Sequence, residues 1–211
     1  QMVDKVVDTT AAKEFGLHEG ELTVMIHTGS RGLGHQVCSD HVKAIEAEYH
    51  EIGGRWVSQK WGFDIADRQL ACAPIHSREG QAYLDSMRAA GNFAFANRSA
   101  LTERVRQSFR TISSNDADIS VAYDVSHNIA KVETHTVHGE SCKCCVHRKG
   151  ATRAFSGSNP DLNERFRGVG QPVLVPGDMG RASWVLAGPK IGENDAFSSS
   201  CHGAGRRLSR T

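Results

Sequence analysis

One long segment with helical periodicity limits the folds that this chain can adopt, because the fold must include a long helix or two consecutive helices. In residues 77–112, apolar side chains recur in steps of three, four or seven residues, as they do along one face of an α-helix. Gly91 lies inside this segment, so the pattern predicts either one long helix or two helices broken near that glycine. The repeating side chains are Tyr83, Met87, Ala90, Ala94, Leu101, Val105 and Phe109.

Short runs of β-type residues surround the helical segment. Residues 22–26 form an apolar run that predicts a strand, followed by a glycine-rich turn and a helix. A second run predicts a strand that reaches Tyr123, with a loop or short helix around His127. Three other segments combine turns and strands: a hairpin turn in 139–144, a strand and loop in 145–155, and two short strands around the turn PGDMG in 171–188.

The order of these elements predicts an α+β fold with mixed sheets and flanking helices, because strands and helices do not alternate as they do in βαβ proteins. With 211 residues, 39% of them hydrophobic, the chain can bury a sizeable core, and we expect residues 1–211 to form a single domain. The chain begins at Gln1 and stops directly after a dense polar motif. This predicts a fragment of a larger catalytic domain.

The charge of the chain indicates what kind of anion site is possible, and its cysteine content indicates the redox compartment. The net charge is +1, so a polyanion site has to come from local clusters of Arg and Lys. No apolar run has the length of a membrane span, and no secretion signal is present at the start. Without signs of secretion, the six cysteines favour reduced thiols in the cytoplasm over disulfides.

The string HTGSRGLGH, residues 27–35, follows the first apolar run. A glycine-rich loop after a strand can present backbone N–H groups and the Arg31 side chain to a phosphate, while His27 binds a metal. A tight turn with a structural histidine is the alternative. The glycine and lysine spacing fits neither a Walker A loop nor a dinucleotide-binding fingerprint.

Two further strings combine histidine or basic residues with turn residues. YDVSHNIAK places His127 and Asn128 after a β-type run, where a histidine is either a metal ligand or a core or capping residue. HRKGATRAF, residues 147–155, gathers one histidine and three basic side chains around Gly150. That cluster is either a contact to phosphate or nucleic acid, or a solvated charged turn.

The segment SSSCHGAGRRLSR, residues 198–210, has the densest chemistry. Its small residues let a substrate approach the backbone around His202. If a helix begins near Gly205, Arg206 and Arg210 lie on one face and can hold an anion beside the imidazole. A neutral imidazole can attack an activated phosphorus, although a glycine-rich structural loop remains open as an alternative.

The string CKCC is the one cysteine cluster. It contains Cys142, Cys144 and Cys145, without a second CxxC or a paired histidine set at zinc-ribbon spacing. We therefore expect an exposed hairpin tip with incidental thiols rather than a metal site.

Five of these strings together resemble the RtcB family of RNA ligases. They occur in the family's order and extend over nearly the whole chain. Because each string is long and specific, a chance match of all five is very improbable. The strings are HTGSRGLGHQV, YDVSHNIAK, HRKGATRAF, GQPVLVPGDMG and CHGAGRRLSR.

The resemblance assigns roles by motif. It makes His202 the nucleophile that accepts guanylate, and His27 and His127 ligands of manganese. The chain has Asp178 and Arg181 where some members of the family have Ser and Thr. The family's remaining metal ligands, an Asp and a Cys in one motif and a His in another, have no match here. The residues implied to contact GTP or phosphate are Arg31, Asn128, Lys149, Asp178, Met179, Ser183, Arg206 and Arg210.

The resemblance also implies a reaction. Members of the family use GTP and two Mn²⁺ ions to join an RNA 3′-phosphate or 2′,3′-cyclic phosphate to a 5′-hydroxyl, through a guanylyl-histidine intermediate. The implied partners are tRNA halves or damaged RNA with such ends, and an activating protein. Because part of the metal site is missing, we expect residues 1–211 alone to be inactive or nearly so.

Two other functions remain open on the residues alone. A metal-dependent phosphoesterase would use His27 and His127 for metal but form no covalent guanylate. A non-catalytic RNA-binding or scaffold protein would keep the fold and ligate nothing. Labelling with GTP separates both from the ligase.

Overall fold

The computed structural model describes residues 1–113, 119–177 and 180–203. Their contacts divide the chain into two compact units. The first unit contains residues 1–25 and the described part of 118–211, and the second contains the described part of 26–117.

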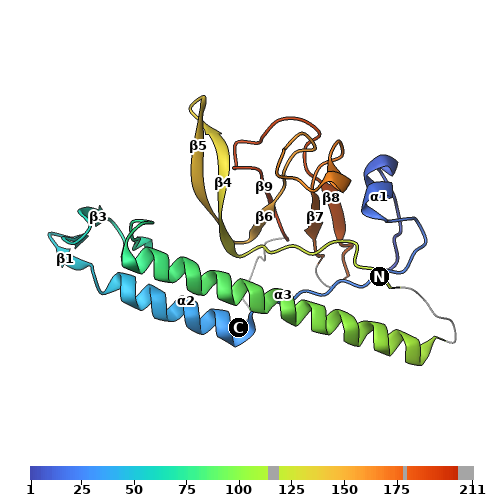
Figure 1. Cartoon of the computed structure of the whole chain (residues 1–211), viewed down its shortest axis with the longest axis horizontal. Helices are drawn as coiled ribbons and strands as arrows, with labels where there is room; N and C mark the ends of the chain where they lie inside the picture. The colour runs from blue at the N-terminus through green and yellow to red at the C-terminus, as the bar shows by residue number, and fades with distance from the viewer. Residues whose placement is uncertain (114–118, 178–179, 204–211) are drawn as a thin grey trace. The chain divides into compact units, whose positions relative to one another are not determined.

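The second unit is built on two antiparallel helices. Helix α2 (Arg31–Glu46) and helix α3 (Arg78–Ile112) lie side by side (Figure 1). His41 of α2 stacks edge-on against Tyr83 of α3, with ring centroids 5.9 Å apart. An added Cβ at Gly34 would lie 3.8 Å from the Cβ of Ala90, so the helices approach each other closely there. Among the described residues, no helix has both the length and the apolar character needed to cross a membrane.

Helix α3 is continuous, which decides between the two predictions for residues 77–112. Ser77 caps its first turn by accepting a hydrogen bond from the Gly80 N–H at 3.0 Å. Gly91 does not break the helix. An internal glycine costs only about 1 kcal/mol relative to alanine, and the packing of α3 against α2 offsets that cost.

A small antiparallel sheet completes the second unit. It has the order β1-β2-β3, with Glu51 opposite Trp56 and Val57 opposite Asp64. Tyr49, just before it, is buried and its hydroxyl donates to the Cys72 carbonyl oxygen at 2.7 Å. The bounds are β1 His50–Ile52, β2 Arg55–Ser58, β3 Phe63–Ile65 and the 3-10 helix η1 Arg68–Leu70.

The first unit consists of short antiparallel strand pairs and one short helix. Its longest pair is β4-β5, and the other pairs are β6-β9 and β7-β8. The bounds are α1 Thr9–Phe15, β4 Ile129–Val137, β5 Glu140–Arg148, β6 Ala151–Arg153, η2 Glu164–Phe166, β7 Pro172–Val175, β8 Trp184–Ala187 and β9 Ser199–Cys201.

An apolar cluster joins α1, η2 and the segment that follows β6. Phe15 at the end of α1 meets Phe166 of η2 edge-on, with ring centroids 5.7 Å apart. Tyr123 contacts the same Phe166 ring at 5.6 Å. Phe155 is 1% exposed, so burying these rings removes much apolar surface from water. The cluster consists of Ala11, Phe15, Phe155, Leu162, Phe166 and Val169.

The structure confirms the α+β class, and the strand pairings within the described residues are antiparallel. The two strands predicted around PGDMG are β7 and β8. The hairpin predicted in 139–144 is also present, but its turn is at His138 and Gly139 and the following residues belong to β5.

Two predicted strands are absent from the described structure. Residues 22–26 form no strand and make a single antiparallel bridge, between Met2 and Leu22. Leu22 and Val24 are 66% and 50% exposed, so this apolar run has a short partner in residues 1–3 but lacks the buried face that would stabilise a longer strand pair. The described residues of the run that reaches Tyr123 likewise belong to no assigned strand. A short apolar run is too short for its periodicity to distinguish a strand from another structure.

Candidate functional site

Two predicted site residues, His127 and His202, come together in the first unit. His127 lies in the bend before β4, and His202 directly follows β9. Their imidazole rings are stacked, with centroids 3.9 Å apart and planes inclined by 15°. Both side chains are half-buried. Two imidazolium cations at this separation would repel each other, so the stack favours a state with at least one neutral ring. Neutral imidazole is both a metal ligand and a nucleophile.

Backbone contacts around Gly150 bring the two histidines together. The Gly150 N–H donates to the Asn128 side-chain oxygen at 3.1 Å, and its carbonyl accepts from the His202 N–H at 3.5 Å. Gly150 has φ 68°, a left-handed conformation that a side chain would strain. Asn128 therefore has a structural role beside the one predicted for it, since it ties the loop before β4 to the loop before β6. Lys149 is exposed in that second loop.

The basic cluster HRKGATRAF does not form a solvated turn as a whole. Arg148 is buried, and its guanidinium donates two hydrogen bonds to Glu133 of β4, at 2.9 and 2.8 Å. That alternative is therefore wrong for Arg148, because its charge is neutralised inside the unit. Lys149 remains exposed beside it.

Glu133 belongs to a larger buried network. Its carboxylate lies 3.0 Å from Nε2 of His135, whose Nδ1 contacts the carboxylate of Glu193. Burial raises the pKa of Glu133, but the hydrogen bonds from Arg148 and His135 outweigh it and hold that pKa below its ordinary value. Lys131 lies on the same face of β4, and burial, followed by the nearby Arg153, lowers the pKa of its ammonium group.

The turn between β7 and β8 is partly described. The Gly177 N–H donates to the Ser183 hydroxyl at 3.0 Å, so Ser183 closes this turn. Four other predicted contacts to GTP or phosphate lie outside the described residues: Asp178, Met179, Arg206 and Arg210. The helix expected near Gly205 lies outside them as well.

His27 belongs to the second unit, where its side chain is exposed at the start of the loop before α2. Helix α3 holds this loop. Asn97 donates to the Gly29 carbonyl at 2.9 Å, and Arg98 donates to the Thr28 carbonyl at 3.4 Å. The sequence analysis missed both α3 residues, because each falls in an ordinary polar position of the helical pattern.

Arg31, the first residue of α2, has φ 50°. A left-handed conformation costs a residue with a side chain roughly 1–2 kcal/mol, and glycine largely escapes that cost. The loop predicted to bind phosphate thus contains a residue under backbone strain. Such strain persists only where surrounding contacts impose it.

Replacing Arg31 tests this strain. Arg31→Gly is expected to have a free energy of unfolding about 1 kcal/mol above that of Arg31→Ala. Both variants lack the guanidinium, so the comparison isolates the backbone. Urea denaturation of the two proteins measures the difference. Equal stabilities would show that the backbone at this position is not strained.

The cysteines carry no disulfide. All six lie in the described ranges as thiols. On β5, the Cys145 sulfur lies 3.7 Å from Nε2 of His147, and the Cys144 thiol donates to the Cys142 carbonyl at 3.7 Å. The cluster is within the strand β5 rather than at the hairpin tip that was predicted for it. The strand alternation places Cys142 and Cys144 on one face and Cys145 on the other.

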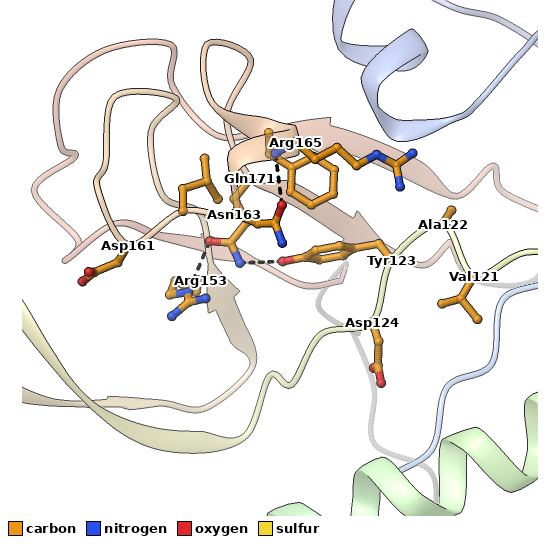
Figure 2. Close-up of a pocket in the computed structure, with 11 residues that line it drawn as sticks. Val121, Ala122, Tyr123, Asp124, Arg153, Asp161, Asn163, Arg165 and Gln171 are labelled. Carbon is orange, nitrogen blue, oxygen red and sulfur yellow. Dashed lines mark hydrogen bonds between the residues drawn. The ribbon is translucent and has the colours of Figure 1, made fainter.

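A shallow cavity of about 560 Å³ lies between the segment at Tyr123 and the loops around η2. Figure 2 shows Gln171 in its wall, donating to the Tyr123 hydroxyl at 2.6 Å and accepting from Arg153 at 3.3 Å. Arg165 donates to the Glu14 carbonyl at 2.7 Å. These polar groups bind one another, so they connect the extended segment before His127 to the core. Burial raises the pKa of Tyr123, which keeps its hydroxyl protonated.

Several of these residues left only weak signals in the sequence. Lys131, Glu133 and His135 occupy alternate positions of β4, and three charged or titratable residues at that spacing would ordinarily indicate a solvated strand face. Gln171 stands in the motif GQPVLVPGDMG without a feature that sets it apart. Their burial depends on segments distant in the sequence.

Comparisons with known proteins identify the family of this chain. The sequence profile of the family described as tRNA-splicing ligase RtcB matches residues 1–211. The tRNA-splicing ligase RtcB of Thermococcus kodakarensis is 50% identical over 213 residues, covering 100% of this chain and 42% of the relative. The RNA-splicing ligase RtcB of Mycobacterium bovis is 52% identical over 210 residues, covering 100% of this chain and 46% of the relative.

A less similar relative also matches the whole of this chain. The tRNA-splicing ligase RtcB of Methanocaldococcus jannaschii is 45% identical over 213 residues, covering 100% of this chain and 21% of the relative. The chain thus spans less than half the length of these curated relatives. A profile match and identities of this size over its whole length establish that the chain belongs to the RtcB family.

Proposed function

We propose that this chain is the catalytic part of a GTP-dependent RNA ligase, acting in tRNA splicing or RNA repair. The observation that supports it most is the stacked pair of His127 and His202 in a member of this family. One of these imidazoles is the predicted nucleophile and the other a predicted metal ligand. The proposed substrates are RNA ends with a 3′-phosphate or 2′,3′-cyclic phosphate and with a 5′-hydroxyl.

The donor groups of the first unit fit a borderline metal. Imidazole nitrogens suit Mn²⁺ less strongly than carboxylates do, but they are accepted in mixed ligand sets. His127 is half-buried and lies beside the proposed nucleophile, and His27 is the second proposed ligand. When bound, two Mn²⁺ ions would polarise the phosphates and neutralise developing charge. The remaining ligands would come from protein outside this sequence.

In the proposed first step, a neutral His202 nitrogen attacks the α-phosphorus of GTP. A nitrogen–phosphorus bond forms, the bond to the β-phosphate breaks, and pyrophosphate leaves. An oxygen of the RNA 3′-phosphate then attacks the same phosphorus and releases the histidine. Finally, the 5′-hydroxyl loses its proton and attacks the RNA 3′-phosphate, and GMP leaves as the new phosphodiester forms.

The basic side chains have the complementary role of holding phosphates. Arg31 at the start of α2 and exposed Lys149 are proposed to stabilise charge on GTP or RNA. Asn128 and Ser183 are proposed to contact the nucleotide from their loops. Asp178, Met179, Arg206 and Arg210 complete the proposed GTP and phosphate contacts.

A labelling experiment tests the proposal. The full-length protein is incubated with Mn²⁺ and GTP labelled at the α-phosphate, and protein-bound label is measured. We expect a covalent label that is lost in acid and retained in base, because a histidine phosphoramidate hydrolyses on protonation. GTP labelled at the γ-phosphate serves as the control and should leave no label. Absence of α-label under these conditions would refute a guanylyl-histidine ligase.

The two other functions are outcomes of the same experiment. A metal-dependent phosphoesterase would release phosphate from RNA ends without becoming labelled. A scaffold protein would bind RNA and neither become labelled nor ligate. We further propose that residues 1–211 form a single domain within a larger catalytic domain, and that an activating protein assists the full-length protein. The isolated piece is expected to ligate little or nothing.

A further inference from the structure

A strained turn lies just before the strand that leads to His202. Phe197 and Ser198 have φ 52° and 47°, and both are residues with side chains. Each such left-handed residue costs roughly 1–2 kcal/mol, so two in succession are unstable unless other contacts impose them. Strand β9 begins immediately afterwards at Ser199. The turn therefore sets the direction in which β9 approaches its partner β6.

Arg148 supplies much of what holds this turn. Its Nη2 donates to the Phe197 carbonyl at 2.8 Å, and its Nε donates to the Ser199 hydroxyl at 2.9 Å. One guanidinium thus forms hydrogen bonds with the residues on both sides of Ser198. The Ser198 carbonyl accepts from the Ala154 N–H at 2.7 Å, which connects the turn to the end of β6.

Arg148 is itself fixed in place. Its side chain is 3% exposed, and that of Glu133 is 4% exposed. The two form a bidentate pair, which restricts a guanidinium in orientation as well as in position. His135 and Glu193 extend the network, and the hydroxyl of Ser198 lies 3.4 Å from the Glu193 carboxylate. The turn is thereby attached to β4 and β5.

The turn, β9 and His202 are consecutive in the chain. Strand β9 pairs with β6 over three residues, with Ala151 opposite Cys201. Beyond it, the His202 N–H meets the Gly150 carbonyl at 3.5 Å, a long hydrogen bond. Such a short ladder holds its last residue weakly by itself. The first residue of β9 has firmer contacts, because Arg148 at the end of β5 donates to the Ser199 hydroxyl and Asn194 donates to the Ser199 carbonyl at 2.9 Å.

We propose that Arg148, oriented by Glu133, is a positioning residue that holds His202 in its place against His127. This inference rests on the proposed function, in which His202 is the nucleophile. A displacement of about 1 Å in a reacting group can lower a rate about 100-fold. Arg148 touches neither GTP nor RNA in this role, and it acts only through the turn and β9.

Two mild variants test the role in the full-length protein. Arg148→Lys keeps the charge beside Glu133 but cannot bind Glu133, Phe197 and Ser199 together. Ser199→Ala removes one of these contacts and leaves the ion pair intact. Arg167→Lys is the matched control, because Arg167 is an exposed arginine of the same unit paired with Glu164 at 3.5 Å. Melting temperatures establish that each variant folds.

Two measurements are made on each variant. The first is the rate of α-labelling at saturating GTP and Mn²⁺, together with the GTP concentration that gives half of that rate. The second is amide hydrogen exchange in residues 199–203 of the protein without GTP or metal. Arg148→Lys is expected to slow labelling about 10- to 100-fold, with half-saturation changed less than about 2-fold. Exchange in residues 199–203 should rise about 10-fold or more, since the local opening free energy falls.

Ser199→Ala should give the same pattern with a smaller change, and Arg167→Lys should match the wild type. The inference is overturned if the wild type is labelled while both test variants retain its rate and exchange. It is also overturned if only half-saturation changes, because that would make Arg148 a GTP-binding residue. If Arg148→Lys does not fold, Ser199→Ala decides. An unlabelled wild type would instead refute the proposed function, and this inference with it.

Discussion

His202→Ala is expected to lower covalent guanylate labelling by at least about 1,000-fold, because the variant has no atom at this position that can attack phosphorus. Its methyl side chain also removes one member of the stack with His127. The measurement is the amount of acid-labile label after incubation with Mn²⁺ and α-labelled GTP. RNA ligation by the same protein should fall in parallel.

Cys201→Ala is the matched control for this variant. Cys201 is the exposed neighbour of His202 at the end of β9, and its thiol is the nearest other nucleophile in sequence. We expect this variant to retain the label. Persistent label in His202→Ala, or its loss in Cys201→Ala alone, would show that the nucleophile has been assigned to the wrong residue. Binding of unlabelled GTP, measured by calorimetry, separates loss of chemistry from loss of the nucleotide site.

Arg148→Met is expected to lower the free energy of unfolding by about 3–5 kcal/mol, which is typical when one partner of a buried ion pair is removed. Methionine fills much of the same space but leaves the Glu133 carboxylate buried opposite an apolar chain. It also releases the contacts to Phe197 and Ser199. Urea denaturation of the full-length protein measures the loss, and Arg167→Met serves as the exposed control.

The double variant Glu133→Gln/Arg148→Met should recover at least about 1 kcal/mol of that loss, because it no longer buries an unpaired charge. If Arg148→Met is as stable as the wild type, the ion pair does not stabilise the unit. If the double variant is less stable than the sum of the two single changes predicts, the buried charge is not the cause of the loss.

Acid adds a second test of the same pair. The pKa of Glu133 is lower in the folded protein than its ordinary value near 4.3, so the ionised carboxylate stabilises the fold at neutral pH. This contribution to stability is complete at pH values above the ordinary pKa of the unfolded chain. It is lost as the pH falls from there through the lower pKa of the folded protein. Glu133→Gln should therefore show a weaker loss of stability below about pH 4.3 than the wild type.

The predictions for the fold succeeded where a long periodic segment was present. Residues 77–112 cover about ten turns of helix, and in the predicted pattern Ala90 and Ala94 are buried and Tyr83 packs against His41, although the buried Leu84 lies outside that pattern. The strand prediction for residues 22–26 was wrong because four apolar residues and one threonine carry no comparable period, and a strand also needs a buried face. The break considered at Gly91 failed because packing outweighs a small local preference.

The predictions for the site divide in a similar way. His127 and His202 were singled out from their motifs, and their stacking was not predictable from either motif alone. The role of Arg148 was misjudged in part, since the basic string gives no sign that its side chain reaches Glu133. In the β4-β5 register Arg148 is opposite Ile129 and Glu133 is opposite Cys144, so the contact depends on the arginine side chain extending along the hairpin.

The amino-acid sequence by itself determined the residue types available for chemistry, their order along the chain, the helical character of residues 77–112 and the resemblance to a family. These depend on local patterns and on strings that can be read in one dimension. The tertiary structure alone decided that His127 and His202 meet, and that Arg148 is buried against Glu133 while Lys149 remains exposed. The physical reason is that strand pairing joins segments distant in the sequence, and desolvation of a charge depends on everything that surrounds it in space.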